Sequence, residues 1–391
     1  MNILILGAGA AGLSAAKTIL ENEPSARLTI VQREDCLPYS PVVLPYYIEG
    51  KISKQDMCLL GDRNWPPGVE AVRGKAVRSI EQTGRGGRVA LDDGRVIGYE
   101  RLLICTGASP AMPDPAALAG KNFVVLRTLE DADRILSAGA KRIATLGAGP
   151  VAVELAIALK RKGLEVTLIV RSRVMRRLFD PDFSEIIKDI MVAGGVDVLL
   201  GQSITEPRGT PPETVLVDRT GIACDMLVVA LGVKPNLDFL QGSGITTGGS
   251  GGIVVDGKMR TSVDYVYAAG DCAETEDYVT GKRGINAIWP EAVVQGKIAA
   301  LNMIGAQVTY PGGISRNVIN VFGVPVFSAG SLVGEKKTVL TPLARVRYTF
   351  RDARIVGIQS IGEVSKGSIL APILKGSKHP DWLLRSLRPN N

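Results

Sequence analysis

The sequence predicts an α/β protein with two Rossmann-like dinucleotide-binding domains and a small α+β domain at its C-terminal end. The first observation is an apolar run at 2–6 that leads into a glycine-rich turn and an alanine-rich helical pattern. The second is the return of the same order from residue 142. The third is a change after residue 308 to short, alternating apolar runs, which are typical of an antiparallel sheet. Because each glycine-rich unit suits one dinucleotide, we expect two redox cofactors.

The first glycine-rich turn has the spacing that holds a pyrophosphate. Gly7 allows the tight turn, Gly9 lets the backbone approach the phosphates, and Gly12 lets the helix pack closely on the strand. The free N–H groups of Ala10 and Ala11, at the positive end of the helix, are expected to face the anion.

The run at 27–31 is predicted to be the second strand of this unit, whose end normally carries an acid for the adenosine ribose hydroxyls. The sequence has Gln32 at that place, followed by Arg33 and Glu34. The amide of Gln32 can still hydrogen-bond a hydroxyl, and Glu34 is the alternative.

The second unit repeats the pattern at 142–152, where Gly147 and Gly149 form the turn and Pro150 and Val151 open the helix. A second copy in one chain makes the signal much more specific than a lone glycine-rich turn.

The next strand, 165–170, ends without the carboxylate that an NAD-preferring site places near Val170. Arginines follow instead, and guanidinium groups suit a 2′-phosphate. We therefore expect NADPH to be favoured over NADH, the alternative being a solvated basic loop. The arginines are Arg171, Arg173, Arg176 and Arg177.

Length and composition exclude several classes of protein. The chain has 391 residues, 46% of them hydrophobic, which is enough for two or three domains with large cores. No apolar run approaches the roughly 20 residues that cross a bilayer, and no basic leader precedes the first strand, so a cytoplasmic location is expected. The net charge of +7 is spread along the chain, with no basic stripe that alternates with aromatic residues, so nucleic-acid binding is disfavoured. A positively charged face that docks an acidic electron-transfer partner is favoured instead.

The five cysteines are scattered, and none forms a CxxC motif. This spacing disfavours disulfides, zinc and iron–sulfur clusters, so no metal site is expected. The cysteines are Cys36, Cys58, Cys105, Cys224 and Cys272.

Two adjoining segments carry a family resemblance. Residues 44–52, Leu-Pro-Tyr-Tyr-Ile-Glu-Gly-Lys-Ile, resemble the flavin-facing segment of coenzyme A disulfide reductases and NADH oxidases. Residues 38–41, Pro-Tyr-Ser-Pro, resemble ferredoxin, rubredoxin and nitrite reductase flavoproteins. All belong to the glutathione-reductase-like superfamily with two dinucleotide-binding domains, and the similarity covers nearly the whole chain.

Further motifs extend the resemblance. Residues 99–110 resemble the strand and Thr-Gly turn that leave the FAD domain, 225–236 the return crossover, and 261–274 the segment with a Gly-Asp pair at the FAD ribityl and pyrophosphate. Residues 288–304 resemble a helix, here beginning near Glu291, whose N-terminus points at the flavin pyrimidine ring.

The resemblance implies a discontinuous FAD domain, 1–109 and 230–306, an inserted NAD(P) domain, 110–229, and an interface domain, 307–391. It assigns to FAD Gly7, Gly9, Ala10, Ala11, Gly12, Gln32, Arg33, Glu34, Ser40, Pro41, Thr106, Gly107, Gly270, Asp271, Glu291 and Ala292. It assigns to NAD(P) Gly147, Gly149, Pro150, Val151, Glu154, Arg171, Arg177 and Gly232.

The candidate catalytic residues are Glu154, at the family's position beside the nicotinamide, and Tyr46 of the flavin-facing segment. The redox cysteine of the disulfide reductases would fall at Val42, which cannot form a thiolate. The histidine base of the glutathione reductases has no counterpart except His379, which we expect on the surface.

The C-terminal part is expected to form strands and two short helices, 365–374 and 381–387. The segment 382–388 is expected to dock onto its own or a partner chain, a membrane-surface role being less favoured. The expected strands are 318–322, 324–329, 344–350 and 354–361.

The resemblance implies an FAD-dependent NAD(P)H:acceptor oxidoreductase in which hydride passes between the nicotinamide and the flavin. Without a redox thiol, the second electron partner is expected to be an external iron–sulfur protein or subunit, in a homo-oligomer or larger complex. The alternatives are a disulfide or peroxide reductase that uses Cys36, a peripheral quinone reductase, and a structural FAD-binding subunit.

Overall fold

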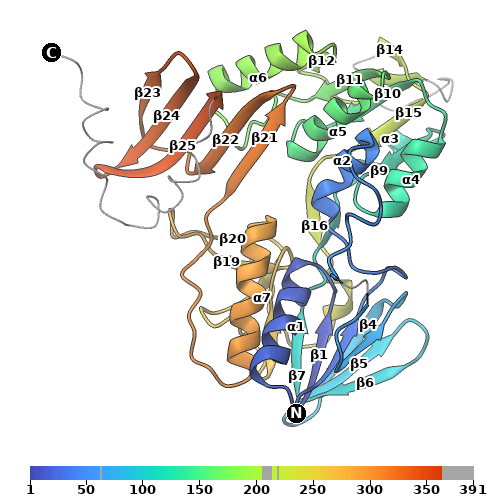
Figure 1. The fold of residues 1–391 in the computed structure, drawn as a ribbon, viewed down its shortest axis with the longest axis vertical. Coiled ribbons are helices and arrows are strands. Elements are labelled where there is room, and N and C mark those ends of the chain that lie inside the picture. The colour runs from blue at the N-terminus through green and yellow to red at the C-terminus, as the bar shows by residue number, and fades with distance from the viewer. Residues whose placement is uncertain (62–63, 205–213, 218–219, 363–391) are drawn as a thin grey trace. The chain divides into compact units, whose positions relative to one another are not determined.

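The computed structural model describes residues 1–61, 64–204, 214–217 and 220–362 (Figure 1). The chain forms two compact units, each built from segments that are far apart in sequence. The first unit comprises Met1–Val42, Lys54–Ser109 and Val233–Gly313. The second comprises Val43–Ser53, Pro110–Gly232 and the chain from Ile314 onward.

The first unit contains a five-stranded parallel sheet in the order β18-β7-β1-β2-β3. Its central strand β1 is buried because its run of branched aliphatic side chains is covered on both faces. Helices α1 and α7 pack side by side in this unit (Figure 1). The strands are β1 (Asn2–Leu6), β2 (Arg27–Val31), β3 (Val69–Val72), β7 (Arg101–Ile104) and β18 (Val266–Ala268), and the helices α1 (Ala10–Asn22) and α7 (Trp289–Met303).

Smaller elements complete this unit. An antiparallel sheet between β3 and β7 was not expected from the sequence. Its strands are β4 (Val77–Gln82), β5 (Gly87–Leu91) and β6 (Val96–Tyr99); the others are η1 (Pro41–Val43), β8 (Ala108–Pro110), β16 (Val233–Pro235), η2 (Asp238–Leu240), β17 (Ile253–Val254), β19 (Ala273–Glu276) and β20 (Arg283–Gly284).

The second unit repeats the parallel arrangement in the order β12-β11-β10-β15-β9. The two matching sheets confirm the predicted pair of Rossmann-like domains. The elements are α3 (Pro115–Leu118), β9 (Phe123–Val125), α4 (Leu129–Ser137), β10 (Arg142–Leu146), α5 (Pro150–Arg161), β11 (Glu165–Val170), α6 (Pro181–Ala193), β12 (Asp197–Leu200), β13 (Thr214–Val217), β14 (Thr220–Ala223) and β15 (Met226–Val229).

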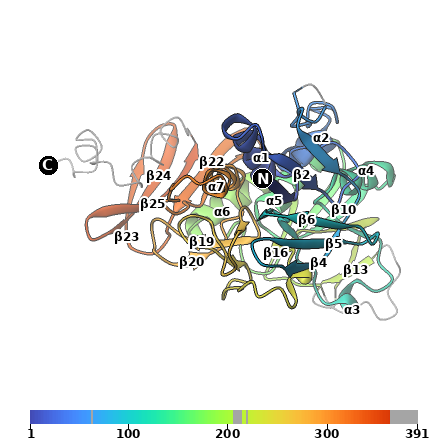
Figure 2. The same ribbon diagram turned by 90° about the horizontal axis from the view of Figure 1, so that it is seen from below.

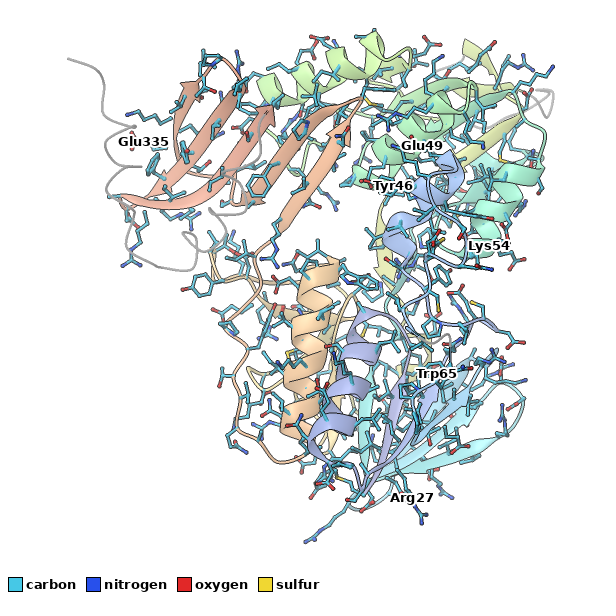
Figure 3. All side chains as sticks on the ribbon, viewed as in Figure 1. Arg27, Tyr46, Glu49, Lys54, Trp65 and Glu335 are labelled. Carbon is cyan, nitrogen blue, oxygen red and sulfur yellow. The ribbon has the colours of Figure 1, made fainter. Side chains whose placement is uncertain are left out.

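Helix α2 (Leu44–Glu49) carries the predicted flavin-facing segment and groups with the second unit. The Tyr47 hydroxyl donates to Asp133 of α4 at 2.8 Å. Arg161 of α5 lies 3.2 Å from Glu49, which is labelled on α2 in Figure 3. These polar contacts fasten α2 to the helices beside the second sheet.

The second unit also contains an antiparallel sheet in the order β21-β22-β25-β24-β23. Figure 2 labels β22 to β25 of this sheet. The strand β23 was not expected, and the predicted segments 365–374, 381–387 and 382–388, with His379, lie outside the described residues. None of the helices in the described part is long and apolar enough to cross a membrane. The strands are β21 (Arg316–Val321), β22 (Val324–Gly330), β23 (Glu335–Leu340), β24 (Ala344–Arg351) and β25 (Arg354–Gly362).

Candidate nucleotide-binding sites

The first turn needs glycine at two positions for steric reasons. Gly7 has φ +112°, and a Cβ there would lie 2.1 Å from the carbonyl oxygen of Cys105. A Cβ on Gly12 would lie 1.9 Å from the carbonyl oxygen of Gly7. Strand β1, the turn and α1 can therefore approach this closely only without side chains at these positions.

Gly9 has a different role in the same turn. It is the N-cap of α1, and no side chain caps that helix. A Cβ built on Gly9 would find no heavy atom within 4 Å. The space above the turn is open, and the N–H groups of Ala10, Ala11 and Gly12 have no partner within the helix, as a pyrophosphate requires.

The Gly270–Asp271 pair lies against the first turn of α1. Gly270 has φ +82°, and its Cβ would lie 3.2 Å from that of Ala11. Gly296 of α7 permits this packing, because a Cβ there would lie 2.1 Å from the carbonyl oxygen of Ala11. The sequence signal for this packing was the position of Gly296 inside a helical pattern, because a glycine in the middle of a helix often has a packing reason.

A buried hydrogen-bond chain holds this arrangement together. The Gly270 N–H donates to Gln295 Oε1 at 2.8 Å, Gln295 Nε2 donates to the Tyr310 hydroxyl at 3.3 Å, and that hydroxyl donates to Glu291 Oε2 at 2.7 Å. Burial raises the pKa of Tyr310 above its usual range, and the bond to Glu291 raises it further, so the hydroxyl remains a donor. Sequence reasoning singled out Glu291 but missed Gln295 and Tyr310.

The Thr106–Gly107 turn is tied to the returning segment. Thr106 Oγ1 donates to the Asn236 carbonyl, and Asn236 Nδ2 donates to the Thr106 carbonyl, both at 2.9 Å. Ser109 Oγ donates to Asn236 Oδ1 at 2.6 Å. Asn236 therefore joins the end of β7 to the segment that begins with β16.

The end of β2 is arranged around a buried glutamine. Gln32 is 7% exposed, and its Nε2 donates to the carbonyls of Glu34, at 2.7 Å, and Cys36. Its donors thus shape the loop, and its amide oxygen is the group suited to accept from a ribose hydroxyl. The Glu34 carboxylate accepts from the Tyr39 hydroxyl at 2.6 Å. Arg33 is exposed, and Ser40 and Pro41 are half-buried.

The second turn follows the rules of the first. Gly147 has φ +128°, and its Cβ would lie 2.2 Å from the carbonyl oxygen of Ala230. Gly149 is the uncapped N-cap of α5 and faces open space, and Pro150 takes the first helical position. Val151 is exposed next to it, and Gly232, with φ +107°, follows β15 as Gly107 follows β7.

Glu154 lies on α5, half-buried, with no hydrogen bond or ion pair from any described residue. Burial raises its pKa to about 7, so the carboxyl can hold or release a proton near neutrality. Tyr46, labelled on α2 in Figure 3, is 38% exposed, and Lys51 Nζ lies 5.9 Å from its ring centroid.

Replacing Glu154 with glutamine is expected to make the protein more stable at high pH. Between about pH 4.5 and pH 7 the unfolded carboxyl ionises while the folded one does not, so the wild type loses stability in that window. We expect the difference in unfolding free energy between Glu154→Gln and wild type to be about 1–3 kcal/mol more favourable to the variant at pH ~8 than at pH ~4. Urea unfolding at both pH values measures this, with the exposed Glu130→Gln as control; parallel pH profiles for wild type and Glu154→Gln would contradict the prediction.

The arginines after β11 divide into two kinds. Arg171, Arg176 and Arg177 are exposed. Arg173 turns inward, and its guanidinium donates to the carbonyls of Arg176 and Phe179 at 3.2 and 3.5 Å. The exposed guanidinium groups are the ones available to an anion.

Three of the five thiols are poorly suited to redox chemistry. Burial raises the pKa of Cys36, with Glu34 and Asp35 adding to the effect, and burial raises the pKa of Cys272 to about 11. Cys105 is buried, and burial raises its pKa as well. Reactive thiols need the opposite shift.

Comparison with known proteins agrees with this geometry. A family model described as "Pyridine nucleotide-disulphide oxidoreductase" matches residues 1–296. The NADH-dependent phenylglyoxylate dehydrogenase subunit epsilon of Aromatoleum evansii is 32% identical over 385 residues, which are 95% of this chain and 90% of that protein.

Solved structures show the same fold. An NAD-dependent persulfide reductase from A. fulgidus matches with a TM-score of 0.90 and 26% identity, over 98% of this chain and 79% of that chain. The NADH:rubredoxin oxidoreductase from Clostridium acetobutylicum matches with a TM-score of 0.80 and 26% identity, over 99% of both chains. The protein is an FAD-dependent NAD(P)H oxidoreductase, and it belongs to the pyridine nucleotide-disulphide oxidoreductase family.

Proposed function

We propose that this enzyme passes electrons between NADPH and an external iron–sulfur protein or partner subunit, without a redox-active thiol of its own. The proposal depends on the absence of a reactive cysteine at the position where the resemblance places one. Valine stands at position 42, where the resemblance places the redox cysteine, and burial raises the pKa of Cys36, the thiol nearest to it in sequence. A chain that relays no electrons through sulfur needs a partner that takes them from the flavin.

The first unit holds FAD in this proposal. The N–H groups at the start of α1 bind the pyrophosphate, Gly270 and Asp271 lie at the same turn, and Gln32 accepts from the adenosine ribose. Thr106, held by Asn236, lies beside the first turn, because a Cβ on Gly7 would be 3.4 Å from the Thr106 nitrogen. FAD supplies a centre that takes up two electrons together and can release them singly.

The second unit binds the nicotinamide dinucleotide in this proposal. The N-terminus of α5 takes the pyrophosphate, and Glu154 holds a proton that it can exchange near neutral pH. Arg171 and Arg177 bind the 2′-phosphate, which favours NADPH. The name of the Aromatoleum relative, which specifies NADH, supports the opposite preference, so the nucleotide requires a direct test.

Two comparisons support a protein partner. The Aromatoleum relative is named as a subunit, and the Clostridium neighbour is named for rubredoxin. The name of the persulfide reductase supports the rival function, in which a sulfur substrate is reduced.

Anaerobic titration of the purified yellow protein with NADPH and with NADH, followed by turnover with one-electron acceptor proteins, tests the proposal. We expect bleaching of the flavin by NADPH at lower concentration than by NADH, and turnover with an iron–sulfur protein. Faster turnover with a persulfide or a quinone would favour the corresponding rival, and no bleaching by either nucleotide would favour a structural subunit.

Cys36→Ser is expected to keep turnover within about twofold of wild type, because a protonated, half-buried thiol takes no part in the transfer. Cys58→Ser is the matched control, since Cys58 is also half-buried and belongs to the same unit. A loss of more than about tenfold in Cys36→Ser alone, with a change in flavin spectrum on reduction, would establish the thiol mechanism instead.

A further inference from the structure

The antiparallel sheet of the second unit reaches the loop that carries the exposed arginines. Side chains from β22, β23, β24 and β25 contact the segment 178–182, which runs from the end of this loop into the first turn of α6. They are Ser328, Lys336, Arg347 and Gln359.

Asp180 is the centre of these contacts. Gln359 pairs with it twice: Nε2 donates to the carboxylate at 2.9 Å, and Oε1 accepts from the backbone N–H at 2.7 Å. Lys336 Nζ and Arg347 Nη1 donate to the same carboxylate at 2.7 and 3.0 Å. Ser328 Oγ donates to the carbonyl of Leu178 at 2.5 Å.

The two residues at the centre of these contacts are buried. Asp180 is 5% exposed, and Gln359 is fully buried. The rings of Phe179 and Phe183 stack 6.5 Å apart, and the Arg347 guanidinium lies 4.8 Å from the Phe183 ring centroid. Hydrogen bonds to a charged, buried group are the strong kind, so this anchor holds one conformation.

An ordinary helix start does not explain this arrangement. Asp180 is the N-cap residue of α6, where an aspartate usually accepts from the first backbone N–H groups, but its side chain makes no capping bond. The carboxylate is directed to the sheet instead. The other part of the loop is fixed as well, because the Met175 N–H donates to the carbonyl of Ala148 in the second glycine-rich turn at 2.7 Å.

We propose that Asp180 and Gln359 are positioning residues for nucleotide selection. By fixing the end of the loop they hold Arg171 and Arg177 where both can reach the 2′-phosphate of the dinucleotide. This inference rests on the proposed preference for NADPH. It makes Gln359, on β25 of the antiparallel sheet, one of the residues on which that preference depends.

The test measures binding of adenosine 2′,5′-bisphosphate and adenosine 5′-monophosphate to the purified holoprotein by calorimetry. Gln359→Leu is expected to weaken bisphosphate binding by about tenfold, because the competent loop conformation becomes a minority state, and to change monophosphate binding by less than about twofold. Lys336→Met, at an exposed residue, is expected to shift the ratio of the two affinities by roughly threefold if Gln359→Leu does not fold.

Asp225→Asn is the matched control. Asp225 accepts from the Arg142 side chain at 2.7 Å and from two backbone N–H groups at the start of β10, in the same unit. Asp225→Asn is expected to lower the free energy of unfolding without changing the ratio of the affinities for adenosine 2′,5′-bisphosphate and adenosine 5′-monophosphate.

The outcomes separate the inference from the proposed function. If Arg171→Ala and Arg177→Ala lose the preference for the bisphosphate while Gln359→Leu and Lys336→Met keep it, the positioning role is overturned and the NADPH preference stands. If Gln359→Leu weakened the binding of both nucleotides equally, the positioning role would also be overturned. If neither arginine variant changes the preference, the NADPH proposal fails and the positioning role fails with it.

Discussion

Gly9→Ala is expected to give a folded protein that has lost most of its FAD. The φ and ψ angles of Gly9, −78° and −166°, suit any residue, and its Cβ meets no protein atom within 4 Å. The methyl group would occupy the space of the pyrophosphate, and overpacking of this kind costs about 1–3 kcal/mol, or roughly 5- to 150-fold in affinity. Flavin absorbance relative to protein absorbance after gel filtration, and FAD titration of the apoprotein, measure the effect.

Gly12→Ala in the same turn is expected to fail differently. Its Cβ would lie 1.9 Å from the carbonyl oxygen of Gly7, so the backbone itself must move. A loss of more than about 4 kcal/mol in unfolding free energy is expected, visible as poor solubility or a much lower Tm. Gly249→Ala, at an exposed glycine with open space, is the control. Normal FAD content in Gly9→Ala would refute the assignment of this turn to the pyrophosphate.

The double variant Arg171→Ala/Arg177→Ala is expected to lose the preference for NADPH. Each guanidinium would contribute about 1.5–3 kcal/mol through charge-assisted hydrogen bonds to the 2′-phosphate, so kcat/KM for NADPH should fall by roughly 10²- to 10⁴-fold when both are lost. The same ratio for NADH, which has no phosphate there, should stay within about threefold. Steady-state kinetics with both nucleotides and a fixed acceptor measure this.

Arg354→Ala, at an exposed arginine where β25 begins, controls for the loss of surface charge. An unchanged kcat/KM for NADPH in the double variant would identify the arginine loop as solvated surface. An equal fall for both nucleotides would place the arginines at a part of the dinucleotide that the two share.

Some elements of the sheet could not be found in the sequence. Strand β23 contains Glu335, Lys336 and Lys337, which resemble a charged turn, but it is an edge strand, where charged side chains are favoured. The helix expected near Glu291 begins at Trp289, because proline at the next position suits the first turn of a helix.

The sequence alone determined the two glycine-rich turns, since φ angles and close backbone approaches are properties of a few adjacent residues. It also determined that arginines, and no carboxylate, follow β11. Only the tertiary structure decided which buried polar groups pair: Gly270 with Gln295, Tyr310 with Glu291, and Asp180 with Gln359, which is 179 positions away. A buried amide or carboxylate bonds to whatever the packed strands and helices bring within reach, and local sequence does not specify that partner.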